Sequence, residues 1–202
     1  MLSDEPMRLS RTLRALRAAW LPLVLSGFAL TVPRARAAGG DEPDPEALIK
    51  AAMIFNFTKV VEWQDGAGAD SAGFVLGLVG HGPTIDALRT IDGKPVGRST
   101  LRVRTIGDPA GLAACQLVFF ERSGRDTLQS FLRALEHAAV LTVSDRDGFA
   151  EGGGVVQFAR RQNHVRILVN LDAAERAKLR FSSQLLKIAE IVREKGGHAF
   201  PG

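Results

Sequence analysis

Cysteine is almost absent from this chain: Cys115 is the only cysteine among the 202 residues. A single thiol excludes an internal disulfide bond, which leaves a free thiol or an intermolecular disulfide. Cys115 begins the apolar run CQLVFFE (115–121), and such a run predicts a buried strand. A packed free thiol is therefore the simpler interpretation. Zinc binding or cysteine catalysis would need further ligands or a neighbouring base, and the sequence shows neither.

Metal-binding and catalytic motifs are scarce as well. Ser144, Asp145 and Asp147 follow a predicted strand, and active sites of α/β proteins often lie at strand ends. The chain has no G-x-S-x-G motif, however, so these residues are more simply a capped turn. Four histidines are dispersed along the chain without a pair at i+2 or i+4: His81, His137, His164 and His198. We predict no catalytic residue, no metal and no cofactor.

Two glycine-rich segments are candidates for anion binding. In GLVGHGPT (77–84), backbone N–H groups between a strand and a helix could hold a phosphate. The spacing of Gly77, Gly80 and Gly82 is G-x-x-G-x-G, however, and the dinucleotide motif is G-x-G-x-x-G. An ordinary turn is therefore the simpler interpretation. Gly152–Gly154 has two interpretations. It could be an anion nest or a mobile flap, or it could be an ordinary loop that needs glycine for its backbone angles.

An excess of positive charge is lacking outside the first 37 residues. Residues 1–37 hold six of the 26 basic and two of the 22 acidic side chains, so the remainder is formally neutral. Nucleic acids and anionic membranes bind clustered lysine and arginine, and a neutral chain therefore argues against both partners. The basic run ARRQNHVR (159–166) is interpreted as a solvated hairpin tip, with a phosphate site as the alternative.

The amino-terminal apolar stretch is too short for an ordinary membrane-spanning helix, which needs about 20 residues. Residues 18–32 are apolar, follow four spaced arginines and precede Ala35-Arg36-Ala37, which is the three-part pattern of a secretory signal. An uncleaved anchor is the alternative. The predicted organisation is a cleaved signal peptide over 1–37, a linker over 38–45, a single α/β domain over 46–195 and a C-terminal tail over 196–202.

Strand and helix patterns alternate through the middle of the chain. Strands are predicted at 74–80, 101–106, 115–121 and 139–145, and helices at 83–91 and 125–136. Further on, a tight hairpin is predicted at Gln162-Asn163, between the strands VVQFARR and HVRILVN. A final helix is predicted after Ser182. We therefore predict an α/β fold: a single-layer mixed, partly parallel sheet flanked by helices, with a C-terminal β-hairpin and helix.

The segment ALIKAAMIFNFTKVVEW (47–63) predicts a helix that is unusually apolar, with Asp44 as its N-cap. Its polar residues form one narrow strip that includes Glu46, Lys50, Thr58 and Glu62. The remaining surface must be covered on several sides, so we expect both the sheet and a second protomer or another protein to contact it. The predicted interface residues are Phe55, Phe57, Val60 and Trp63.

Three blocks taken together resemble the YfiR family. They are IKAAMIFNFTKVVEW (49–63), VLTVSDRDGFAEGGGVVQF (140–158) and VRILVNLDAAERAKLRFSSQLLKIAEIV (165–192), in the order and at the spacing of that family. The last block, which includes Asn170, Ser182 and Ser183, is the most specific. One departure is that Gly77 stands where relatives carry a cysteine partner for Cys115, so the resemblance does not extend to redox control.

The resemblance implies an exported, periplasmic, non-enzymatic regulator that tends to form homodimers. Such a regulator binds the periplasmic sensory domain of an inner-membrane diguanylate cyclase, inhibits it and so controls cyclic-di-GMP and biofilm formation. An outer-membrane lipoprotein can sequester the regulator, and other members accompany sensor kinases or receptors. A periplasmic small-ligand-binding module using the loops at Gly80–Gly82 and Ser144–Gly154 is the first alternative. An enzyme at the same strand ends is the second.

Overall fold

The structure is a computed structural model. It describes residues 44–64, 73–162 and 164–194. The predicted signal peptide, most of the predicted linker and the predicted C-terminal tail lie outside these residues, as do His198 and Asn163. Within the described part, no helix is both long enough and apolar enough to cross a bilayer.

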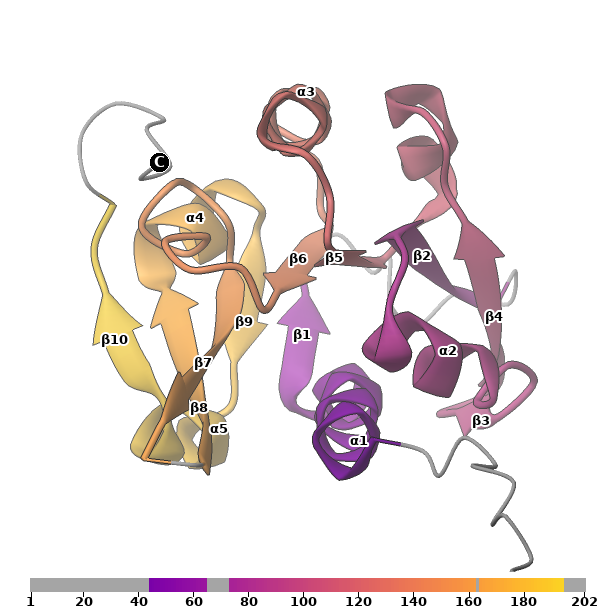
Figure 1. Cartoon of the computed structure of the whole chain (residues 1–202), viewed down its shortest axis with the longest axis horizontal. Coiled ribbons are helices and arrows are strands. Elements are labelled where there is room, and N and C mark those ends of the chain that lie inside the picture. The colour runs from indigo at the N-terminus through magenta and orange to yellow at the C-terminus, as the bar shows by residue number, and fades with distance from the viewer. Residues whose placement is uncertain (1–43, 65–72, 163, 195–202) are drawn as a thin grey trace, which may run out of the picture. The chain divides into compact units, whose positions relative to one another are not determined.

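The described residues form helices and strands that alternate through most of the chain (Figure 1). The helices are α1 (Pro45–Val60), α2 (Pro83–Arg89), the 3₁₀ helix η1 (Pro109–Ala114), α3 (Arg125–Ala134), α4 (Leu171–Arg176) and α5 (Ser183–Ile188). The strands are β1 (Val61–Trp63), β2 (Phe74–Gly80), β3 (Pro95–Val96), β4 (Ser99–Thr105), β5 (Leu117–Glu121), β6 (Leu141–Ser144), β7 (Val156–Arg161), β8 (His164–Asn170), β9 (Leu179–Phe181) and β10 (Glu190–Val192).

Eight strands form one mixed sheet in the order β10-β8-β7-β6-β5-β2-β4-β3. Strands β4, β2, β5, β6 and β7 are parallel to their neighbours in this series, whereas β8 pairs antiparallel with β7. The predicted α/β fold with a mixed, partly parallel sheet and a C-terminal hairpin is confirmed. Strand β4, which follows β2 in the chain, lies on one side of β2 in the sheet, and β5, which comes later, lies on the other side. The carboxyl ends of β2 and β5 therefore lie at a switch point in strand order, where α/β proteins often bind ligands.

Both faces of the central strands are buried, because each is covered by helices. In β2, Leu76 and Leu78 belong to the core that α1 and α2 cover, whereas Val75 and Val79 belong to the core that α3 and η1 cover. This alternation follows from the two-residue period of a strand. In Figure 1, α1 and α2 accordingly lie on one side of the sheet and α3 lies on the other.

Two predicted helices end earlier than the sequence pattern indicates. The first helix was predicted to 63, but it stops at Val60, and Val61–Trp63 forms β1, which pairs antiparallel with β9. The final helix, α5, stops at Ile188, and Glu190–Val192 pairs parallel with β8 as an edge strand. Both breaks fall next to valine and isoleucine residues, whose branched side chains favour strands once a pairing partner is present.

Candidate functional site

The glycine-containing turn after β2 is occupied by a side chain of the protein itself. Glu121, at the end of β5, is 5% exposed, and its carboxylate accepts hydrogen bonds from the backbone N–H groups of Thr84 (3.3 Å) and Ile85 (2.8 Å) at the start of α2. A Cβ atom at Gly82 would collide with that carboxylate. The N–H groups that could have held a phosphate therefore already have an anionic partner, which supports the ordinary turn over a cofactor loop.

The polar residues after β6 are also engaged with one another. The Ser144 hydroxyl donates to the Phe120 carbonyl oxygen (2.9 Å) and accepts from the N–H of Arg146 (3.1 Å). Asp145 accepts from the Lys50 ammonium of α1 (2.8 Å), and Lys50 also pairs with Glu46 (3.0 Å). Ser144 and Asp145 thus tie α1, β5 and β6 together, and no histidine of the described residues forms a catalytic arrangement with either of them.

Lys50 is the centre of this ion-pair cluster. Its side chain is 12% exposed, and burial alone would lower its pKa. The hydrogen bonds to Asp145 and Glu46 outweigh burial, so the pKa of Lys50 is raised above its usual value of 10.5. Glu46 in turn pairs with Arg160 of β7 (3.2 Å), so the first part of the predicted polar strip, at Glu46 and Lys50, faces the sheet and its C-terminal hairpin.

The substitution Lys50→Met is expected to lower the free energy of unfolding by about 2 kcal/mol at pH 7, because it leaves Asp145 and Glu46 without their shared cation. The raised pKa means that Lys50 contributes fully below pH 10.5 and loses its contribution as the pH rises through the higher folded value. Urea unfolding at pH 7 and pH 11 checks this. Lys59→Met on the exposed side of α1 is the control, and an equal loss in both variants at pH 7 would contradict the prediction.

The described histidines and Cys115 do not form a metal site or a catalytic site with one another. His81, His137 and His164 are exposed, and the described residues contain no cluster of three or more His, Cys, Asp or Glu that could hold a metal. Cys115 is 4% exposed, and burial raises the pKa of its thiol although Arg104 opposes the change. The thiol is therefore protonated at neutral pH and a poor nucleophile, as the packed free thiol of the sequence analysis requires.

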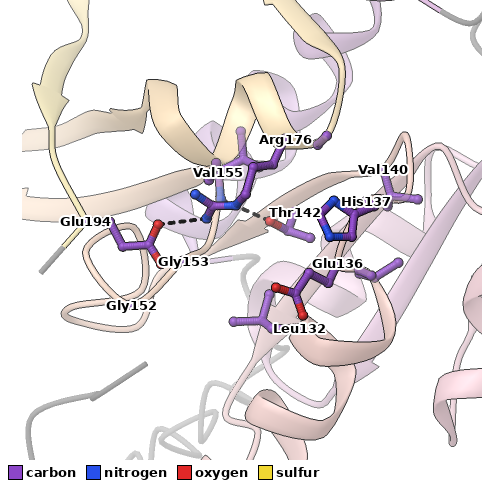
Figure 2. A pocket seen from close by; sticks show the side chains of 13 residues that line it. Leu132, Glu136, His137, Val140, Thr142, Gly152, Gly153, Val155, Arg176 and Glu194 are labelled. Carbon is purple, nitrogen blue, oxygen red and sulfur yellow. Dashed lines mark hydrogen bonds and ion pairs between the residues drawn. The ribbon is translucent and has the colours of Figure 1, made fainter. Parts of the chain in front are cut away.

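A cavity of about 220 Å³ lies between the end of α3, the Gly152–Gly154 loop and α4. Figure 2 shows its charged rim, with Arg176 and Glu194 on one side and Glu136 and His137 on the other. Arg176 and Glu194 are ion-paired at 2.8 Å. Of the two glycine-rich segments, this one therefore opens onto a space large enough for a small molecule.

The exposed face of α1 is the second candidate. Leu48 and Ile49 are 47% and 49% exposed, and they are two of the four large apolar side chains classed as exposed in the described residues. Met53 and Phe55 beside them are partly buried. Grooves flank this surface. One lies against α2 at Ala87 and against Ile91 and Lys94 of the turn that follows α2, and the other lies against the β7–β8 hairpin at His164 and Val165. We call Leu48, Ile49, Ala52 and Phe55 the α1 face.

Two of the four residues predicted at an interface are inside the domain. Phe57 is 2% exposed and stacks on Phe158, with ring centroids 6.0 Å apart. Trp63 is 8% exposed, packs edge-on against Phe74 and donates its indole N–H to the Gln116 carbonyl oxygen (3.2 Å). Both side chains belong to the core under α1 and β1, so they give a partner no surface in this structure.

The other two predicted residues, Phe55 and Val60, are partly exposed and stay predictions. Leu48 and Ile49 are not among the predicted interface residues, because the polar strip predicts the solvent-facing side of the helix to lie elsewhere. A usable signal was present nonetheless. Leu48, Ala52, Asn56 and Lys59 recur at three- or four-residue spacing and include two polar residues, as an exposed stripe does.

Comparison with protein families gives one match that spans most of the domain. The family model DUF4154, described as YfiR/HmsC-like, matches residues 47–190. The chain belongs to the YfiR/HmsC-like family. No curated protein matches the chain.

The solved structures that are similar to this YfiR/HmsC-like protein include the following two. A conserved domain protein from Vibrio cholerae O1 biovar El Tor has a TM-score of 0.51 and 10% identity, over 73% of this chain and 60% of its own. An ABC domain from Streptococcus pneumoniae, in complex with L-Trp, has a TM-score of 0.47 and 7% identity, over 70% of this chain and 60% of its own. The chain therefore spans 60% of the length of each, and the first likeness shows the fold alone.

Proposed function

We propose that this YfiR/HmsC-like protein is an exported, non-catalytic regulator that acts by binding another protein through the α1 face. Its client is the periplasmic sensory domain of an inner-membrane signalling protein, with a diguanylate cyclase as the first choice and a sensor kinase as the second. Binding holds the client inactive and so limits cyclic-di-GMP and biofilm formation. An outer-membrane lipoprotein that sequesters the regulator would release this block.

The observation that carries this proposal is the exposure of Leu48 and Ile49 on a helix whose opposite side is fully packed. Large apolar side chains that lie together on a surface favour contact with another protein, because burying them removes apolar area from water. The polar groups at the strand ends support the same conclusion. Glu121, Ser144 and Asp145 are each held by other groups of the domain.

The substitution Ile49→Asp is expected to abolish regulation while leaving the fold intact, because it puts a charge at the centre of the contact and disturbs no core residue. The test uses host cells that lack the protein. Complementation with the natural chain should lower cellular cyclic-di-GMP, and complementation with Ile49→Asp should not.

Ile188→Asp is the matched control, because Ile188 is 67% exposed and lies on α5, so it is not part of the α1 face. This variant should regulate as the natural chain does. If Ile49→Asp lowered cyclic-di-GMP as well as Ile188→Asp does, the α1 face would not be the contact surface. If the natural chain had no effect on cyclic-di-GMP, the diguanylate cyclase would not be the client.

A second candidate function is a small-ligand-binding module, which the cavity beside Gly152 and Gly153 favours. Arg176, Glu194, Glu136 and His137 around its rim offer both signs of charge to a polar ligand (Figure 2). A specific, saturable thermal shift with a nucleotide or an amino acid, lost on Arg176→Ala, would favour this candidate over the first.

A further inference from the structure

A cavity at the carboxyl ends of the parallel strands β5 and β6 is not used by the proposed function. It has a volume of about 200 Å³, lies where the chain leaves these two strands, and has Phe120 and Leu128 as its apolar wall. We call it the β5–β6 cavity. Ligands of α/β proteins commonly bind outside the carboxyl ends of parallel strands. Pockets for drug-sized molecules measure roughly 300–1,000 Å³, so this smaller cavity suits a small ion or the end group of a larger molecule.

Two arginines give the β5–β6 cavity its charge. Arg122 follows β5, Arg146 follows β6, and both side chains line the cavity. Arg146 donates from Nη1 to the Ser123 carbonyl oxygen (3.0 Å), which anchors the side chain and leaves further N–H groups of its guanidinium for a ligand. Arg122 is exposed, and within the described residues it forms no ion pair. Two guanidinium groups from neighbouring strand ends are therefore available at one cavity.

The acidic residues nearby do not cancel this charge. Asp145 is the one carboxylate among the described residues that line the cavity, and the Lys50 ammonium lies 2.8 Å from its Oδ2 atom. Asp126 and Asp147 are close in sequence, but both are exposed and neither lines the cavity. The charge of Asp145 is thus balanced by Lys50, and the two arginines leave the cavity with a positive potential that favours an anion.

The backbone at Arg122 supports a binding role for its side chain. Arg122 has a φ of 49°, which is the left-handed region that glycine adopts freely and other residues adopt at a cost in free energy. Such strained positions gather at ligand-binding and active sites, where the side chain offsets the cost. An arginine in this turn is therefore better explained by what its guanidinium binds than by the geometry of the turn.

We propose that the β5–β6 cavity binds a phosphate group, either as free phosphate or as the end of a small phosphate monoester. A guanidinium presents paired N–H donors that match two phosphate oxygens. Two such groups suit a tetrahedral ion with several charged oxygens, whereas one group is enough for a carboxylate. The cavity and the α1 face have no residue in common, so this site is a function beyond the proposed protein contact.

Isothermal titration calorimetry of the purified protein with sodium phosphate tests the site, with sodium chloride keeping the ionic strength constant. We expect one site per chain with a dissociation constant at or below about 1 mM. The melting temperature should then rise by about 4–7 °C in about 20 mM phosphate. Sodium acetate should bind at least about tenfold more weakly. Glycerol phosphate distinguishes the two sources: tighter binding than phosphate indicates a monoester, and weaker binding indicates the free ion.

Arg122→Gly is the sharpest variant, because it removes a guanidinium and places a glycine where φ is positive. It should weaken phosphate binding at least about tenfold, while the melting temperature without phosphate stays within about 3 °C of that of the natural chain. Lys178→Gly is the matched control. Lys178 is also an exposed cation with a positive φ (54°), but it does not line the cavity, so this variant should bind phosphate as the natural chain does.

Three results would overturn the proposal. The first is the absence of saturable phosphate binding up to about 10 mM, and the second is equal affinity in Arg122→Gly and Lys178→Gly. The third is acetate binding as tight as phosphate binding. These measurements need no client, so their failure would leave the proposed regulation through the α1 face unaffected. A protein that binds phosphate through Arg122 but leaves cyclic-di-GMP unchanged would refute the diguanylate cyclase as client and keep the phosphate site.

Discussion

Replacing Gly77 with cysteine is expected to join β2 to Cys115 through a disulfide bond. A Cβ atom built on Gly77 lies 2.9 Å from the Cys115 sulfur. A disulfide with an S–S bond of about 2.05 Å and ordinary bond angles places these two atoms roughly 3 Å apart. The bond would close a loop of roughly 40 residues, and the chain-entropy model gives about 4 kcal/mol for a loop of that length.

The net gain in the free energy of unfolding should be about 2–3 kcal/mol in the oxidised protein. The same Cβ atom comes within 3.1 Å of an Ile106 carbon and 3.3 Å of a Val118 carbon, and this crowding offsets part of the entropic gain. Urea unfolding with and without a reductant measures the difference. Because burial raises the pKa of the Cys115 thiol, an added oxidant or formation during folding is needed to close the bond.

Gly77→Ala is the matched control, since it adds the same Cβ atom without a sulfur. It should destabilise the protein by about 1–3 kcal/mol, and reduced Gly77→Cys should behave similarly. Thiol titration of the unfolded, oxidised Gly77→Cys protein should find no free thiol. Two titratable thiols per chain would show that the two positions are not in bonding geometry.

Replacing Glu121 with alanine is expected to lower the free energy of unfolding by about 3 kcal/mol. The change leaves the N–H groups of Thr84 and Ile85 buried without an acceptor and removes a negative charge from the amino end of α2. For a domain of this size the melting temperature should fall by roughly 6–12 °C. Circular dichroism during thermal unfolding measures it.

Two further variants separate the carboxylate's hydrogen bonds from its charge. Glu121→Gln keeps one acceptor oxygen and should lose about half as much stability as Glu121→Ala. Asp86→Ala removes a carboxylate from the same first turn of α2, but Asp86 is 70% exposed, so its loss should stay under about 1 kcal/mol. Equal losses in Glu121→Ala and Asp86→Ala would mean that the buried hydrogen bonds contribute nothing.

The first and last helices show where periodicity in the sequence fails to predict the end of a helix. Residues 61–63 and 190–192 lie within helical periodicity, yet each segment pairs with a strand distant in sequence, β9 and β8. A helix predicted from periodicity rests only on neighbours three and four residues away, and such a prediction takes no account of a pairing partner on another strand. The alternating middle of the chain was predictable because there the local pattern and the long-range pairing agree.

The candidate site on α1 was likewise predictable only in part. The sequence indicated that α1 needs covering on several sides, but it could not say which side. Ile54 lies four residues from both Lys50 and Thr58, so it falls on the predicted polar strip. It is nevertheless 1% exposed, because Lys50 of that strip reaches Asp145 and Glu46 reaches Arg160. Those ion pairs turn the strip toward the domain and leave Leu48 and Ile49 outside.

By itself, the sequence determined the alternation of strands and helices, the family and the solitary thiol, because each depends on residue order or count alone. Only the tertiary structure decided which face of α1 is exposed, that Glu121 occupies the turn after β2, and that Gly77 faces the sulfur of Cys115. Each of these depends on residues that lie far apart along the chain and come together only after the sheet has formed.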